Sequence, residues 1–288
     1  SSSRVRNRSR KDKQINRNLI VKEDRNYITM LGTGNALVTR CYNTCFTIHS
    51  GNDASLLVDA GGGNGILTQL ERANIAYDSI HDLFITHVHT DHLMGCIWMV
   101  RMALQFRFPL NVWSHKKVLD LLTDICLQIL PPKETEGIGN VVTMNYLSDG
   151  EQFEAGGFAM QCFDIHSTKE RQFGFTTKLS DGQRLCCLGD EPYSPLCRQY
   201  AEDADWLMSE AFCLYEDRER FQPYEKHHST VLDAARLAER LHVRDLILYH
   251  TEDRTLETRK ERYSAEAKLE FTGQVWVPDD LEKIPLDC

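Results

Sequence analysis

The 288-residue sequence has no long hydrophobic run: no window reaches the roughly 18 apolar residues that a membrane helix needs, so no membrane association is expected. No apolar segment stands near its start, and no secretory signal is expected either. The ten cysteines show no paired framework, which argues against a disulfide-rich secreted protein and predicts a reducing, cytoplasmic compartment. There is no internal repeat, no linker rich in proline or glycine, and no G-x-G-x-x-G phosphate loop.

Negative charge prevails outside one short segment. Residues 1–17 carry seven basic side chains against Asp12, a net of +6, while the whole chain carries −9, so the remainder stands near −15. An acidic body is a poor electrostatic partner for nucleic acid, because phosphate neutralisation needs basic residues. We therefore expect a basic, flexible tail over residues 1–25 and one folded domain over residues 26–288.

The densest group of chemically active residues is Thr86–Leu93, directly behind the apolar run Leu83–Ile85. It places His87, His89, Asp91 and His92 within six residues. Imidazole and carboxylate are preferred ligands of zinc and similar divalent metals. The two histidines two residues apart at the end of a strand can leave it on the same face, and the next two follow at the start of a helix. The segment predicts a metal site.

These four residues form the pattern His-x-His-x-Asp-His, and the chain thereby resembles the metallo-β-lactamase superfamily. The resemblance covers roughly residues 26–280. It implies an α/β fold, the four-layer αββα sandwich, in which two facing sheets hold the metals at one edge. Alternating strands and helices with polar residues at strand ends agree with a layered α/β domain.

Further candidate ligands stand at the ends of later apolar runs. The resemblance implies that His87, His89 and His166 hold one ion, that Asp91, His92 and His250 hold another, and that Asp190 bridges the two. Asp59 ends an apolar run near residue 58, and a buried carboxylate there needs a partner. The second ring nitrogen of a ligand histidine is the expected partner, so Asp59 is assigned a supporting role. His49, His81, His115 and His242 lack ligand neighbours and are expected at the surface.

Three local features resemble the ribonuclease Z branch: the opening segment 30–36, Glu210-Ala211, and the His228-Ser229-Thr230 loop. The resemblance implies that His228 protonates the leaving oxygen, that Glu210 orients His228, and that Asp91 is both ligand and catalytic residue. A homodimer is also implied. The neighbouring His227 is an alternative for the acid.

The expected activity is dinuclear metal-dependent hydrolysis of a phosphodiester, in RNA or in a small nucleotide, by a hydroxide that bridges the two ions. Two ions about 3.5–4 Å apart can activate water and stabilise the attacking and leaving oxygens. Zinc is preferred, with manganese or iron as alternatives, because ligand types alone do not fix the metal. The alternative function is hydrolysis of a lactone, thioester or other carboxylic ester, for which the His228–Glu210 pair has no obvious use.

The sequence departs from the branch at several positions. Ser209 replaces a histidine, Glu191 follows Asp190 where threonine is usual, and residues 40–43 match the branch's Arg-Asn loop only in part. Only 23 residues separate His166 from Asp190. That interval is too short for the long basic arm with which the bacterial enzymes grip transfer RNA. The sequence therefore predicts the catalytic residues of the branch without its arm.

Overall fold

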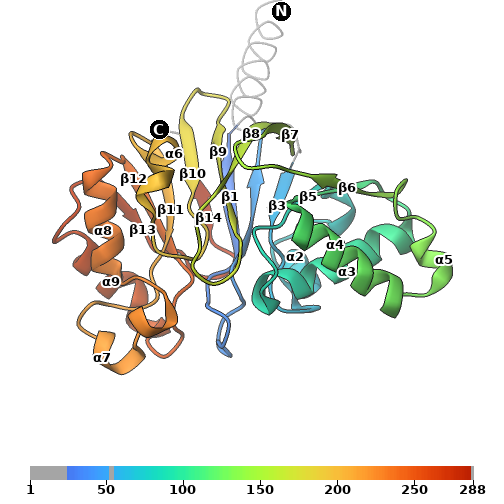
Figure 1. Ribbon diagram of the computed structural model, residues 1–288. Coiled ribbons are helices and arrows are strands. Elements are labelled where there is room, and N and C mark those ends of the chain that lie inside the picture. Colours follow the sequence, from blue (N-terminus) through green and yellow to red (C-terminus); the bar gives the residue numbers. More distant parts are fainter. Residues whose placement is uncertain (1–24, 52–54, 287–288) are drawn as a thin grey trace, which may run out of the picture.

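Two seven-stranded sheets lie face to face in the computed structural model, which describes residues 25–51 and 55–286 (Figure 1). The order of the first sheet is β14 (Lys283–Pro285), β1 (Tyr27–Gly32), β2 (Cys45–His49), β3 (Ser55–Val58), β4 (Asp82–Phe84), β5 (Leu110–Ser114) and β6 (Val142–Tyr146). The order of the second is β13 (Gln274–Trp276), β12 (Asp245–Tyr249), β11 (Trp206–Glu210), β10 (Arg184–Cys187), β9 (Phe173–Lys178), β8 (Phe158–Asp164) and β7 (Gln152–Ala155).

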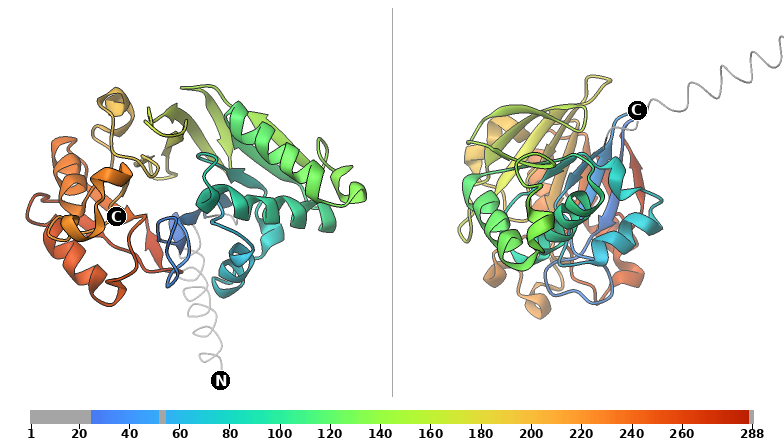
Figure 2. Two further views of the ribbon diagram at one scale, coloured as in Figure 1. Left: turned by 60° about the horizontal axis from the view of Figure 1, so that its bottom comes forward. Right: turned by 90° about the vertical axis from the view of Figure 1, so that its right-hand side faces the viewer.

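Helices cover the outer faces of the two sheets, as both views in Figure 2 show. Those on the first sheet are α2 (Gly65–Arg72), α3 (Thr90–Phe106), α4 (Lys116–Ile129) and α5 (Pro132–Thr135). Those in the second half of the chain are α6 (Arg198–Ala201), α7 (Arg218–Phe221), α8 (Val231–Arg240) and α9 (Leu256–Ala267). Short 3₁₀ turns occupy Tyr77–Ser79, Pro195–Cys197 and Tyr224–Lys226. No helix among the described residues is both long and apolar enough to cross a bilayer.

Successive strand residues point to opposite faces, and here both faces are buried. On β4, Leu83 packs in the layer toward α3 while Phe84 packs between the sheets. On β11, Met208 packs between the sheets while Leu207 packs toward α8. Three hydrophobic clusters therefore alternate with two sheets and two helical layers. The predicted four-layer αββα arrangement is confirmed.

Parallel pairing places the strand ends that carry polar residues at the same edge of each sheet. Strands β3 to β6 are parallel to one another, and so are β10 to β13. Asp59 follows β3, Asp190 follows β10 and His250 follows β12. Because the carboxyl ends of parallel strands share one edge of a sheet, these residues gather at the edge where α/β proteins place their ligands.

The described residues begin at Arg25, so the predicted basic tail lies almost wholly outside them, and the division into tail and single domain stays a prediction. Two of the four surface predictions are wrong: His49 and His115 are buried, whereas His81 and His242 are exposed as predicted. His49 stacks on Tyr27, with 4.3 Å between ring centroids, which a search for ligand neighbours could not foresee.

Candidate metal centre

The metal-binding loop is held against the first sheet by a close approach of helix α3. Gly95 in α3 donates its N–H to the carbonyl of Gly61 at 2.8 Å, and a β-carbon at Gly95 would lie 1.9 Å from the carbonyl oxygen of Ala60. Only glycine permits this distance. The first turn of α3, which carries Asp91 and His92, is thereby fixed beside Asp59.

Two groups of potential ligand atoms meet at this edge, each with all its atoms within 4.8 Å of one another. The first group is His87, His89 and Asp190; the second group is Asp91, His92, Asp190 and His250. No other such group of three or more is found among the described residues.

Asp190 is common to both groups. Its Oδ2 lies 3.6 Å from His87 Nε2, 3.1 Å from His92 Nε2 and 3.5 Å from His250 Nε2. The preceding Gly189 has φ +75°, a left-handed turn that glycine adopts without strain and that projects Asp190 from the end of β10. One carboxylate thus faces imidazoles from both halves of the chain.

Asp59 supports two of the histidines from behind. Its Oδ2 accepts a hydrogen bond from His92 Nδ1 at 2.7 Å and another from the Thr86 hydroxyl, also at 2.7 Å. That hydroxyl lies 2.9 Å from His87 Nδ1, so the second ring nitrogens of both histidines are tied to one carboxylate. Such contacts direct the opposite ring nitrogens toward the ligand groups, where His87 Nε2 lies 2.9 Å from His89 Nδ1. Asp59 adopts φ 54°, one of several left-handed non-glycine residues at this edge.

A further buried side chain, Gln172, connects the two groups and was not predicted. Its Nε2 lies 2.6 Å from His87 Nδ1 and donates to Asp190 Oδ1, while its Oε1 accepts from the Asp190 N–H at 3.0 Å. Thr44 Oγ1 similarly lies 3.2 Å from His250 Nδ1. Neither residue belongs to a recognisable ligand pattern, and only the sheet topology brings them to the site.

Electrostatics set the charge of the centre. Burial opposes ionisation of Asp190, yet the neighbouring His87 and His92 hold the pKa of this carboxyl well below its ordinary value. Burial favours the neutral form of His250 and lowers its pKa to about 3. His92 Nε2 lies 3.1 Å from Asp190 Oδ2 and 3.2 Å from Asp91 Oδ2. Burial opposes charge on His92, yet the surrounding carboxylates raise its pKa well above the ordinary value. The site therefore holds two ionised carboxylates, Asp91 and Asp190, against buried imidazoles, a donor set that a divalent cation fits by taking the place of the proton on His92.

His166 lies outside both groups. Strand β8 ends at Asp164, and His166 has a left-handed φ of 59° while its N–H donates to Asp164 Oδ1 at 2.8 Å. Its side chain is exposed, so the structure does not bring together the full ligand set that the resemblance implies for the first ion.

The His228–Glu210 pair lies beside the second group. His228 Nδ1 is 3.6 Å from Glu210 Oε2, an ion-pair distance that exceeds a hydrogen bond, and its ring centroid is 5.2 Å from that of His250. Burial disfavours charge on His228, but the adjacent Glu210 carboxylate outweighs it and raises the histidine pKa. Ser229 fixes Glu210 by donating from its N–H at 2.7 Å and from its hydroxyl at 2.6 Å. His227 is exposed, in a left-handed conformation.

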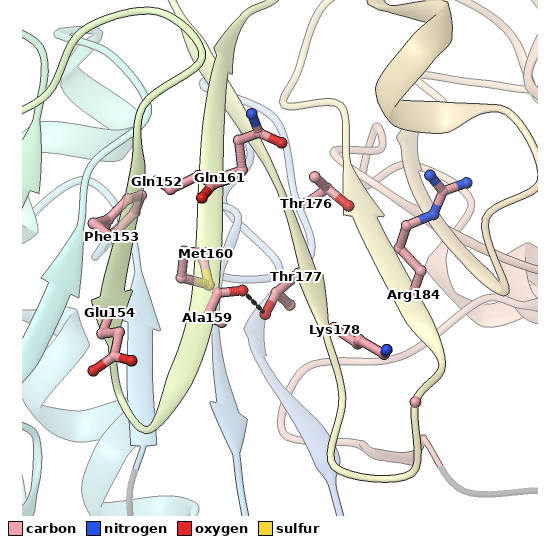
Figure 3. Close-up of a pocket in the computed structure, with 11 residues that line it drawn as sticks. Gln152, Phe153, Glu154, Ala159, Met160, Gln161, Thr176, Thr177, Lys178 and Arg184 are labelled. Carbon is pink, nitrogen blue, oxygen red and sulfur yellow. Dashed lines mark hydrogen bonds between the residues drawn. The ribbon is translucent and has the colours of Figure 1, made fainter.

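A hollow of about 660 Å³ lies away from these residues, on the outer face of the second sheet. Figure 3 shows side chains such as Gln161, Thr176, Lys178 and Arg184 projecting around it from β8, β9 and β10. None of its lining residues belongs to the metal groups, so its size does not make it the reaction site.

Comparison with known proteins agrees with the site. A family model described as Anti-Pycsar protein Apyc1 matches residues 26–275. Ribonuclease Z of Bradyrhizobium diazoefficiens is 24% identical over 259 residues, covering 70% of this chain and 85% of the relative. Ribonuclease Z of Gemmatimonas aurantiaca is 26% identical over 244 residues, covering 68% and 76%.

A solved structure, the metallo-β-lactamase fold protein YhfI of Bacillus subtilis, superposes with a TM-score of 0.71 at 20% identity, over 91% of this chain and 100% of that one. The short form of human tRNase Z gives 0.69 at 20% identity with the same coverage. The predicted resemblance to the metallo-β-lactamase superfamily and its ribonuclease Z-like branch is confirmed.

Proposed function

The chain belongs to the Anti-Pycsar protein Apyc1 family, and from this premise and the site geometry we propose that it is a dinuclear metal-dependent phosphodiesterase. The observation that carries the proposal is the position of Asp190 Oδ2, within 3.6 Å of imidazole nitrogens from both ligand groups. A carboxylate so placed can serve two cations at once. Ribonuclease Z relatives, which by name cleave RNA, support a phosphodiester substrate in RNA or in a nucleotide.

In this proposal His87, His89 and Asp190 bind one ion, and Asp91, His92, Asp190 and His250 bind the other. His166 is exposed and outside both groups, so it joins the first ion only if its side chain turns toward that ion. The two ions, when bound, supply an activated water and stabilise charge on the phosphate oxygens. Asp91 is catalytic through its position among the ligands, and Asp59 and Gln172 keep the histidine rings in their ligating orientation. We propose zinc, with manganese or iron as alternatives, since carboxylate and imidazole ligands accept all three.

His228 donates the proton that the leaving oxygen needs. It is buried beside Glu210, whose negative charge favours the protonated imidazole, and it adjoins His250 of the second ligand group. An alkoxide is a poor leaving group, so a positioned acid contributes about 10²- to 10⁴-fold to its expulsion. An activated acyl substrate gains less from such an acid, and the pair therefore favours phosphodiester over ester hydrolysis.

We also propose a homodimer in the cytoplasm. The resemblance to the ribonuclease Z branch implies the dimer, and Ile129 at the end of α4, 61% exposed, is an apolar position at which it can be probed. The compartment is supported by the free, buried thiols of Cys96 and Cys186, which a reducing environment preserves. Light scattering of the wild type and of an Ile129→Asp variant tests the dimer.

The activity is tested on purified protein supplied with zinc or manganese. The substrates are bis(p-nitrophenyl) phosphate and a precursor transfer RNA with a 3′ trailer, with Asp91→Ala as the inactive variant. His81→Ala, at an exposed histidine away from the ligand groups, is the matched control. We expect hydrolysis of the aryl diester by the wild type and by His81→Ala, and its loss in Asp91→Ala. Absence of hydrolysis of both substrates by metal-loaded protein would overturn the proposal.

A further inference from the structure

Helix α9 carries a buried arginine, Arg259, which belongs to neither ligand group. It is 1% exposed, and burial of a charged guanidinium is unfavourable unless its N–H groups find partners. Nη1 donates to the hydroxyl of Thr33 at 3.1 Å and to that of Thr251 at 2.9 Å. Nη2 donates to the carbonyl of Pro278 at 2.9 Å and to Asp279 Oδ1 at 3.2 Å. One rigid, planar group thereby joins the loop after β1, the end of β12 and the segment after β13.

One of these partners, Thr251, directly follows the metal ligand His250. His250 has a φ of 61°, a left-handed conformation that a non-glycine residue keeps only where the surrounding structure holds it. The Thr251 N–H donates to the carbonyl of Thr33 at 3.0 Å. The Thr251 carbonyl accepts from the Asn35 N–H at 2.9 Å and from Asn35 Nδ2 at 3.0 Å. Because the Thr251 hydroxyl accepts from Arg259, every polar atom of the residue that follows His250 is held in place.

The imidazole ring of His250 depends on the same loop after β1, which spans residues 33–44. Thr44 Oγ1 lies 3.2 Å from His250 Nδ1 and donates to the carbonyl of Gly34 at 2.9 Å. The Thr44 N–H donates to that carbonyl as well, at 3.0 Å. Both the backbone and the ring of His250 are therefore held in position through residues 33–35.

A carboxylate, Asp280, holds this loop together with Arg259. Asp280 Oδ1 accepts from the Thr33 hydroxyl at 2.7 Å, and its Oδ2 accepts from the Tyr42 N–H at 2.6 Å. The Thr33 hydroxyl thus donates to Asp280 while it accepts from Arg259, so its hydrogen is committed to the carboxylate. The loop is held at two points, near its start at Thr33 and near its end at Tyr42.

We propose that Arg259 is a positioning residue for the second metal ion, which it serves by fixing Thr33 and Thr251. These contacts keep the backbone conformation in which His250 Nε2 lies 3.5 Å from Asp190 Oδ2. The inference rests on the proposed function and deepens it, because it names what holds a ligand of the second ion. The histidines of the first ligand group are supported by other side chains. Loss of the Arg259 contacts should therefore weaken the second ion selectively.

Zinc binding tests this role without turnover. Metal-free full chain is titrated with zinc by calorimetry, and the binding step that His250→Ala loses identifies the second ion. Arg259→Lys keeps the charge but not the planar set of donors, and Thr251→Val removes only the hydroxyl that Arg259 contacts. The matched control is Thr177→Val, which removes another buried hydroxyl, one that donates to the carbonyl of Ala159 at 2.9 Å. Urea denaturation of each variant separates a loss of stability from a loss of affinity.

We expect Arg259→Lys and Thr251→Val to bind the second ion about tenfold more weakly, at the lower end of the effect of residues that support a metal ligand. Their affinity for the first ion should not change, and Thr177→Val should bind both ions as the wild type does. Unchanged affinity in both variants, an equal loss for both ions, or a wild type with fewer than two ions overturns the inference. Hydrolysis of bis(p-nitrophenyl) phosphate by the wild type reports separately on the proposed function: two bound ions without hydrolysis would refute that function and not the role of Arg259.

Discussion

The two halves of the chain contribute to the metal centre in different ways. The first half supplies His87 and His89 from the loop after β4, and Asp91 and His92 from the first turn of α3 that follows it. The second half supplies Asp190 and His250 from the ends of two separate strands, with Glu210 and His228 from a third strand end and a loop. The ligands of the first half, which are close in sequence, and those of the second half, which are far apart in sequence, thus meet at the Asp190 carboxylate.

This difference shows two ways in which a layered fold positions ligand residues at one edge of its sheets. In the first half the loop geometry itself fixes the ligands, with Gly95 and Asp59 holding the loop. In the second half each ligand depends on the register of its strand, because Leu246 of β12 pairs with Leu207 of β11, and Leu207 with Cys186 of β10. Asp190, in the second half, is the residue that both ligand groups share. A change at Asp190 should therefore have a larger effect than a change at any one ligand of the first half.

The largest expected effect comes from Asp190→Ala. Because Asp190 faces His87, His92 and His250, its loss should lower the affinity for both ions and reduce phosphodiester hydrolysis by roughly a thousandfold or more. His89→Ala, which belongs to one group only, should retain one ion. Metal content by mass spectrometry and the hydrolysis rate measure both; retention of two ions by Asp190→Ala contradicts the shared role.

His228→Ala is expected to have the next largest effect, in a substrate-dependent way. Loss of the acid should slow hydrolysis of a dinucleotide by about 10²- to 10⁴-fold, but hydrolysis of bis(p-nitrophenyl) phosphate much less, because nitrophenolate leaves without protonation. Glu210→Gln should show the same preference more weakly. An equal loss on both substrates would mean that the pair maintains the fold instead of donating a proton.

The same difference between the two halves explains which part of the site could be predicted from the sequence. The spacing of His87, His89, Asp91 and His92 identified one half of the site, because a local motif is visible in the order of residues. The dispersed half was located only through resemblance to a family. Gln172 and Thr44 carried no signal at all, since a glutamine or threonine becomes a supporting residue only when a folded sheet places it beside an imidazole. His166 shows the converse: its position matches the family pattern, yet it is exposed and lies outside both ligand groups.

Asp59→Asn tests the support within the local half. An asparagine keeps the shape but weakens the acceptor for His92 Nδ1 and the Thr86 hydroxyl, so metal affinity should fall about 10- to 100-fold. Asp82→Asn is the control, since Asp82 bonds Trp113 Nε1 and no ligand histidine. Competition with a chelator measures the affinity; equal behaviour of the two variants would remove the assigned role of Asp59.

The smallest expected effect concerns a histidine of the first half that takes no part in the centre. Burial, assisted by Lys283, lowers the pKa of His49 to about 4, whereas an unfolded histidine titrates near 6.5. Between these values the unfolded chain binds more protons, so the stability that His49 contributes is present above pH 6.5 and is lost as the pH falls toward 4.

His49→Phe retains the ring against Tyr27 but removes this titration. Between pH 7.5 and 5.5 the free energy of unfolding should fall about 1 kcal/mol less in the variant than in the wild type. Urea denaturation at both pH values measures it, and identical pH dependence of the two proteins would contradict the assignment.

The central claim is that residues from both halves of the chain form one metal centre. The number of ions bound per chain tests this claim most directly. Metal-free protein is titrated with zinc and followed by calorimetry, with the bound metal then counted by mass spectrometry. Two ions per chain are expected in the wild type and one in His250→Ala, because His250 belongs to the second ligand group only. A wild type that hydrolyses phosphodiesters with one ion, or a His250→Ala variant that still binds two, would contradict the claim.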